Sequence, residues 1–120
     1  MKYKFKKKNF GVKNDPNPTY FYGVDLDSIE KDEEFALSNL DWHEWTPQEI
    51  QMIIDKTEAL VGDDEYEYQV PGSDFLIIAD KSETHFFAWQ TRQEEADFIW
   101  STEKFINFMK AFKKFVEENS

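Results

Sequence analysis

Two histidines, His43 and His85, are the only imidazole groups in this 120-residue sequence, and imidazole is the group best suited to metal binding or proton transfer at neutral pH. No H-x-x-x-H spacing places two such ligands on one helix face. His43 stands between a tryptophan and a glutamate, and His85 lies in a predicted strand. The chain has no cysteine, which excludes thiolate metal sites and disulfides. Both histidines are therefore expected to pack or to face solvent, and no metal or cofactor is expected.

The acids, serines and glycines form no motif of catalysis or phosphate binding. Asp25 and Asp27 have the spacing that opens a calcium loop, but Ile29 and Glu30 occupy the positions where that loop needs a ligand and a glycine. No serine lies in a G-x-S-x-G motif, and the four glycines are scattered singly. The chain is therefore expected not to be an enzyme. Carboxylates are abundant, so a small carboxylate-dependent hydrolase stays an alternative.

Acidic and aromatic residues are interleaved in several segments. Residues 41–45 read DWHEW and residues 64–68 read DEYEY, while Trp89 and Trp100 flank the acidic stretch 94–97. Tryptophan and tyrosine most often dominate the energy of protein interfaces, and carboxylates around them attract a basic partner and speed its association. The residues expected to contact such a partner are Asp32, Glu33, Glu34, Trp42, Trp45, Asp64, Glu65, Tyr66 and Glu67.

The same aromatic residues have a second interpretation, in which the rings form the core and the acids an ordinary solvated face. The chain contains 12 Phe, 5 Tyr and 4 Trp. This is more aromatic volume than one small core must hold, so several rings are expected to be exposed.

The charge is divided unevenly along the chain. The net charge is −11, yet residues 1–13 hold six lysines and no acid, which leaves eight basic and 25 acidic residues in 14–120, a net charge of −17. Such a surface repels nucleic acid and anionic lipid and attracts a basic protein at long range. We therefore expect a basic protein partner, no direct binding of nucleic acid and no membrane contact.

Strands are predicted first in residues 65–90, which read as a meander of three antiparallel strands joined by two turns. Residues 75–79 are apolar at adjacent positions, so this central strand is expected to be covered on both faces. Alternation predicts an edge strand over residues 2–6, with Tyr3 and Phe5 facing inward, and a hairpin leads to a second strand over residues 19–24. Further short strands are predicted at 35–37 and 97–100, and a loop at 25–34.

Two amphipathic helices are predicted, at residues 47–61 and 102–117. Thr46 can cap the first and Pro47 suits its first position. The second carries a stripe of phenylalanines that would cover the sheet. Residues 1–120 are therefore expected to form a single α+β domain: an antiparallel sheet of about five to six strands with both helices packed on it. The absence of cysteines, of a signal peptide and of a long apolar run favours a cytoplasmic protein.

Scattered positions over most of the chain are similar to the YacL-like family of small uncharacterised bacterial proteins. These positions are Met1-x-Tyr3-x-Phe5, Gly11, Gly62, Glu67-Tyr68, Phe105 and Phe115-Val116. The family's cysteine-glycine pair before the last helix is absent, and Phe98-Ile99-Trp100-Ser101 stands in its place. The resemblance implies no activity.

In general character, the chain resembles immunity proteins that neutralise toxins, many of which are basic nucleases. An immunity protein that occludes a basic toxin domain is therefore the first hypothesis for function. A housekeeping adaptor or regulator that binds a basic ribosomal or nucleic-acid-processing protein is the second, and the carboxylate-dependent hydrolase is the third.

Overall fold

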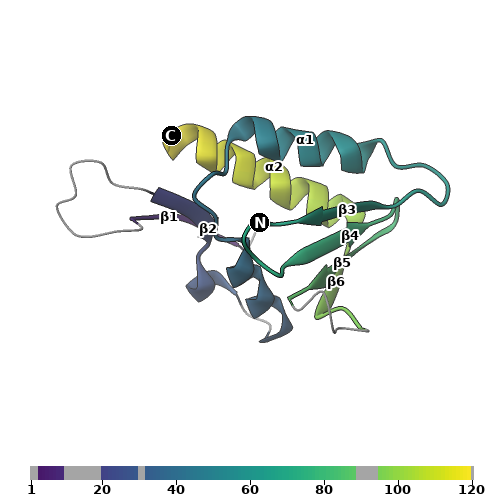
Figure 1. Ribbon diagram of the computed structural model, residues 1–120, viewed down its shortest axis with the longest axis horizontal. Coiled ribbons are helices and arrows are strands. Elements are labelled where there is room, and N and C mark those ends of the chain that lie inside the picture. The colour runs from purple at the N-terminus through teal and green to yellow at the C-terminus, as the bar shows by residue number, and fades with distance from the viewer. Residues whose placement is uncertain (1–2, 10–19, 30–31, 89–94, 120) are drawn as a thin grey trace.

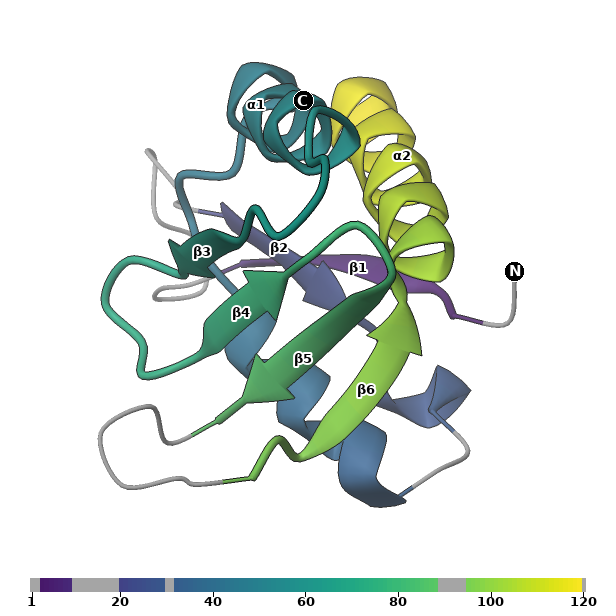
Figure 2. The same cartoon turned by 90° about the vertical axis from the view of Figure 1, so that its right-hand side faces the viewer.

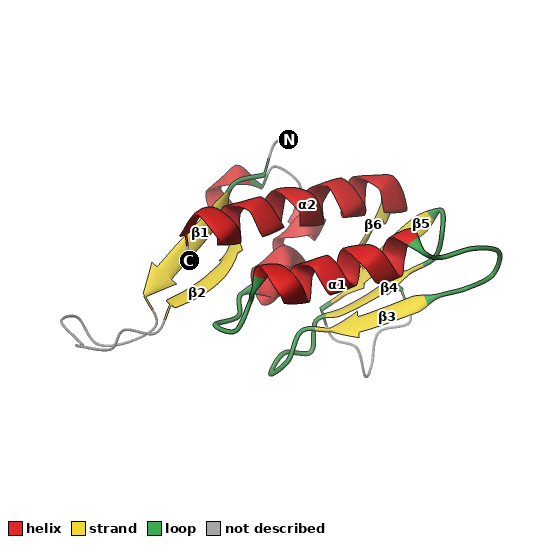
Figure 3. Cartoon of the chain, turned by 90° about the horizontal axis from the view of Figure 1, so that it is seen from above, coloured by secondary structure: helices red, strands yellow, loops and turns green. Residues whose placement is uncertain are grey.

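The structure, a computed structural model, describes residues 3–9, 20–29, 32–88 and 95–119 (Figure 1). Two α-helices lie side by side against one face of a four-stranded sheet, and a two-stranded hairpin lies next to them (Figure 3). The expected α+β class is therefore confirmed. The elements are β1 (Phe5–Asn9), β2 (Tyr20–Val24), the 3-10 helices η1 (Leu26–Ser28) and η2 (Asp32–Leu40), α1 (Pro47–Glu58), β3 (Tyr66–Gln69), β4 (Leu76–Ala79), β5 (Glu83–Phe87), β6 (Phe98–Ser101) and α2 (Thr102–Asn119).

The predicted meander is confirmed. β3, β4 and β5 pair in antiparallel order, and β6 adds a fourth strand after β5. The register places Tyr68, Ile77, Phe86 and Phe98 side by side across the four strands, and all four are buried. This row belongs to the inner face of the sheet, which packs on the helices. Neighbouring residues along each strand point to the opposite face, because side chains alternate with a period of two.

The expected single sheet of five to six strands is wrong, because β1 and β2 form a sheet of their own. The backbone of Trp42 pairs with the edge of β2: the Tyr22 N–H donates to the Trp42 carbonyl at 3.0 Å, and the Trp42 N–H donates to the Tyr22 carbonyl at 3.2 Å. The hairpin therefore pairs there with the segment after η2 and not with the meander. β1 begins at Phe5 and not at residue 2, although Tyr3 and Phe5 face inward as expected.

The helix α1 begins as predicted and ends early. Thr46 caps it, since the Oγ1 atom accepts a hydrogen bond from the Glu49 N–H at 3.1 Å. The helix ends at Glu58 and not at residue 61, because the Leu60 N–H bonds the carbonyl three residues back instead of four. The chain then turns away, so Val61, at the end of the predicted helix, is 68% exposed.

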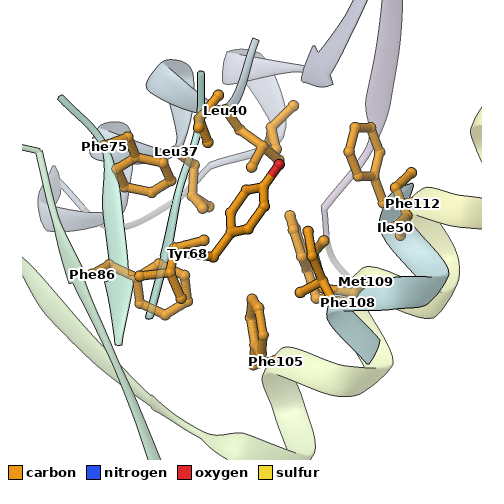
Figure 4. Packing of buried hydrophobic residues seen from close by; sticks show 14 of the residues in the cluster. Leu37, Leu40, Ile50, Tyr68, Phe75, Phe86, Phe105, Phe108, Met109 and Phe112 are labelled. Atoms are coloured by element: carbon orange, nitrogen blue, oxygen red, sulfur yellow. The ribbon is translucent and has the colours of Figure 1, made fainter. Parts of the chain in front are cut away.

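The helix α2 supplies the apolar stripe that closes the core, as predicted, and it extends to Asn119. Figure 4 shows side chains of α2 and of the sheet facing one another around Tyr68. Phe115, in contrast, is half-buried at the edge of the stripe, where it meets Phe5 at a ring-centroid distance of 5.9 Å. The buried residues of the stripe are Phe105, Phe108, Met109, Phe112 and Val116.

Two 3-10 helices stand where a loop over residues 25–34 and a short strand over 35–37 were predicted, so both predictions are corrected. Side chains three residues apart share one face of a 3-10 helix. In η2, Glu34, Leu37 and Leu40 have this spacing, and their exposed fractions are 2%, 0% and 1%. A search for apolar periodicity does not detect the buried face of η2, because Glu34 occupies one of its three positions.

Glu34 joins four parts of the chain inside the protein. The Tyr3 hydroxyl and the Trp100 Nε1–H both donate to Glu34 Oε2, the second at 2.9 Å, and Lys104 Nζ lies 3.9 Å from the same oxygen. A buried carboxylate is costly unless donors replace the water it loses, and here two hydrogen bonds and one cation do so. Glu34 therefore connects η2 to the segment before β1, to β6 and to α2.

Replacing Glu34 with alanine should lower the free energy of unfolding by about 3 kcal/mol or more, since two buried donors lose a charged acceptor. Urea unfolding at neutral pH would measure the change. The matched control is Glu58→Ala, which breaks the exposed ion pair with Lys110 and should cost less than about 1 kcal/mol. Equal losses in the two variants would show that the buried carboxylate has no special role.

Candidate functional site

Two of the residues expected to contact a partner lie in the core, which corrects their assignment to the surface. Trp45 is 3% exposed and Glu34 is 2% exposed. The Trp45 Nε1–H donates to the Leu40 carbonyl at 2.8 Å, and the ring stacks on Tyr68 at a centroid distance of 6.0 Å. A tryptophan whose N–H is satisfied inside the protein can be buried next to acidic neighbours in the sequence.

The remaining predicted contact residues separate into groups. Asp64, Glu65 and Glu67 are exposed, and Tyr66 is half-buried, in the loop before β3 and in β3 itself. Residues 32–33 begin η2, and their side chains lie outside the described part of the structure. Trp42 is half-buried, and it lines a cleft to which none of the other predicted residues contributes.

This cleft is the candidate functional site. It has a volume of about 650 Å³ and forms between β2, the segment that joins η2 to α1, and the β3–β4 turn. Its walls combine apolar and acidic groups. The lining residues are Phe21, Asp41, Trp42, His43, Glu44, Pro71 and Gly72.

Trp42 is held in the cleft wall from two directions. Its backbone pairs with β2 at Tyr22, as described above, and its ring meets Trp45 edge-on, at a centroid distance of 5.1 Å and an angle of 84°. Because Trp45 is anchored in the core, the position of Trp42 is set by the interior of the protein. The ring therefore forms a preorganised wall of the cleft, which lowers the entropy cost of binding.

Asp41 is electrostatically unusual. Its Oδ2 lies 3.5 Å from Lys6 Nζ, whereas its Oδ1 is the one buried side-chain N or O atom of the described residues without a hydrogen-bond partner. Burial raises the pKa of Asp41 above its ordinary value, and the Lys6 ammonium offsets this effect only in part. A carboxylate oxygen that is buried without a donor is unfavourable in the folded protein.

Gly23 makes the position of Asp41 possible. A Cβ atom on this residue would lie 1.7 Å from Asp41 Oδ1 and 2.7 Å from Asp41 Cγ. The carboxylate therefore occupies the space that any other side chain at position 23 would fill. The sequence signal for a glycine here is only its place in β2, where glycine often marks a close approach of another group.

The cleft has the chemistry of a site for an organic cation. A lysine or arginine side chain has an apolar stem that packs on aromatic and proline rings, and a charged head that is attracted to the face of a tryptophan and to carboxylates. His43 and Glu44 lie at the exposed rim, where His43 Nε2 is 3.7 Å from Glu44 Oε1.

Both a cluster of metal-ligating side chains and a helix able to cross a membrane are absent from the described residues. Within them, no three His, Asp or Glu side chains are grouped so that they could hold a metal ion. Neither α1 nor α2, the longest helices of that part of the chain, has the length and apolarity needed to cross a bilayer.

The cleft residues that sequence reasoning missed fall into two groups. Asp41, His43 and Glu44 lie inside the DWHEW segment, whose interleaved acids and rings were a signal, although only its two tryptophans were predicted to contact a partner. Phe21, Pro71 and Gly72 come from segments distant in sequence, and only the pairing of β2 with Trp42 and the packing of the β3–β4 turn bring them together.

Replacing Asp41 with asparagine should raise the melting temperature at pH 7. A carboxyl group whose pKa is raised by folding favours the folded state below its ordinary value of 3.8, and this contribution is lost as the pH rises through the folded-state value. The advantage of the asparagine variant should therefore shrink toward about pH 3. Thermal melts between pH 7 and about pH 3 would test this pH dependence, with the exposed Asp64→Asn variant as control. A lower melting temperature for Asp41→Asn at pH 7 would mean that the Lys6 ion pair dominates.

Replacing Gly23 with alanine should destabilise the fold by about 1–3 kcal/mol, because the new methyl group overlaps the Asp41 carboxylate. In an Asp41→Ala background the cost should be smaller, since most of the overlapping atoms are gone. A double-mutant cycle by urea unfolding measures this coupling. Equal costs in the two backgrounds would assign Gly23 a different role.

Comparison of the chain with protein-family models, with curated proteins and with solved structures gives no match.

Proposed function

We propose that this protein is a non-catalytic domain that binds and occludes a basic protein, as an immunity protein does with a toxin. The observation that carries the proposal is the cleft itself, whose walls combine the aromatic rings of Phe21 and Trp42 with the carboxylates of Asp41 and Glu44. A lysine or arginine side chain of the partner would place its charged head near these carboxylates. Its stem would pack between Phe21, Trp42 and Pro71, and Glu44 would stand at the rim.

The overall charge supports the same type of partner. Residues 14–120 carry a net charge of −17, which attracts a basic surface over distances of about one Debye length, about 8 Å at physiological salt. The long-range field would speed association, while the cleft would slow dissociation. A basic nuclease toxin has the required surface, because it binds nucleic acid through its own positive charges.

The raised pKa of Asp41 favours one alternative function of the same cleft, that of a small hydrolase. A carboxyl group whose pKa is raised by burial is better suited to act as a general acid, and Glu44 is a second carboxyl group in the same walls. A small carboxylate-dependent hydrolase would use such a pair.

A housekeeping adaptor that binds a basic ribosomal or nucleic-acid-processing protein would use the cleft as the immunity protein does. The two functions differ only in whether the partner loses its activity on binding.

Trp42→Ala should weaken partner binding about 30-fold or more, mainly through faster dissociation, if Trp42 anchors a basic side chain. Biolayer interferometry would measure this against a panel of purified basic proteins that includes catalytically inactive nuclease toxins and ribosomal proteins. The matched control is Phe35→Ala, which removes a ring that is 44% exposed on η2 and lies outside the cleft. Glu44→Lys, at the exposed rim, should instead slow association.

The same experiment separates the three functions. Immunity requires that the active toxin loses its activity when equimolar protein is added, whereas an adaptor leaves the activity of its partner unchanged. If no basic protein of the panel binds at low salt and Asp41→Asn abolishes a measurable hydrolysis, the hydrolase is the correct function. Normal binding by Trp42→Ala would remove the cleft from the interface.

A further inference from the structure

The outer face of the four-stranded sheet carries a second, apolar surface that is distinct from the cleft. Two rows of the register cross it: Glu67, Ile78, His85 and Ile99 form one, and Gln69, Leu76 and Phe87 form the other. Residues directly opposite on neighbouring strands touch through their side chains. The two rows therefore form one continuous patch, called here the sheet-face patch, which consists of Leu76, Ile78, His85, Phe87 and Ile99.

The sheet-face patch is open in the described part of the structure. Figure 2 looks onto the sheet with the hairpin and the 3-10 helices behind it and with no described element in front of it. Ile99 is 50% exposed, and the other members are half-buried, while their inner-face neighbours are buried. The expected cover on both faces of the 75–79 strand is therefore complete on the inner face and only partial on the outer face, as far as the described residues show. An antiparallel sheet with one solvated face normally has polar residues there, so a contiguous apolar set indicates an interaction surface.

The charges around the patch indicate which kind of partner it can bind. Glu67 ends one row, and Glu83 lies on the same face of β5, 3.9 Å from the His85 Nε2 atom. A second copy of the chain would bring two such acidic borders and two net charges of −11 together, which is unfavourable. Anionic lipid is repelled for the same reason. A segment with an apolar stripe and flanking lysines or arginines matches both the patch and its border.

We propose that the sheet-face patch binds a basic amphipathic helix of a partner protein. Leucine or isoleucine side chains of the helix would pack on Ile78, Phe87 and Ile99, and its basic residues would reach Glu67 and Glu83. Helices pack on the open faces of sheets because both present apolar side chains from one side. The proposal does not depend on the cleft, and the partner helix need not belong to the protein that the cleft binds.

The probe for this proposal is a synthetic helical peptide of about 18 residues, with leucine on one face and lysine on the others. Fluorescence anisotropy at physiological salt should show saturable binding. Ile99→Thr and Ile78→Thr should each weaken it at least about tenfold, because threonine keeps the β-branched shape but loses apolar contact. The matched control is Val61→Thr, an exposed apolar residue away from the sheet, which should bind as the wild type does. Thermal melts would show that the variants are folded.

A leucine/glutamate peptide of the same design should not bind, and Glu67→Lys should weaken the leucine/lysine peptide more than the exposed control Asp63→Lys does. Ile78, Phe87 and Ile99 do not line the cleft, so failure of the cleft and failure of the patch can be told apart. Equal binding of the two peptides, or normal binding by Ile99→Thr, would overturn the proposal. So would a dimer in sedimentation that Ile99→Thr abolishes, or binding to neutral phosphatidylcholine vesicles that requires Ile99.

Discussion

The buried carboxylate of Glu34 is the interaction on which the other features of this protein depend. It accepts hydrogen bonds from Tyr3 and Trp100, and Lys104 lies both near it and over the Trp100 ring, 4.4 Å from the ring centroid. Replacing such a group with apolar residues can be neutral for stability, so its contribution is best understood as specificity: only one arrangement satisfies every donor. That arrangement holds η2 against the body of the protein. η2 ends at Leu40, whose carbonyl accepts the Trp45 hydrogen bond, and Trp45 supports the cleft wall.

The wall of the cleft contains one feature that is unfavourable for stability. Asp41 is held over Gly23 with one oxygen lacking a donor, which a protein selected for stability alone would avoid. The energetic cost is reduced because Lys6 approaches the other oxygen. The raised pKa of Asp41 has the same cause, since burial disfavours the charged form of the carboxyl group.

The aromatic residues serve the interior more than the surface, contrary to the expectation drawn from their number. A single residue, Phe86, contacts four other rings, those of Phe75, Phe98, Trp100 and Phe105. This cluster joins the sheet to α2. Among the described aromatic residues, those with large exposed fractions are Tyr20 at 40% and Phe35 at 44%. Aromatic richness therefore reflects how a chain of this size builds a dense core, and the two proposed interaction surfaces contain few rings, chiefly Trp42 and Phe87.

Local periodicity in the sequence determined the two α-helices, the meander and the inward side of each, because a helix or strand repeats its buried positions within a few residues. Only the tertiary structure decided that the hairpin forms its own sheet, since the edge of β2 is taken by Trp42, 20 residues away. The same holds for Glu34: an acidic side chain can be buried only where partners distant in sequence, such as Trp100, satisfy its polar atoms. Neither periodicity nor composition contains those long-range partners, and so the sequence determined the two α-helices and the meander, while packing decided the two 3-10 helices and the site.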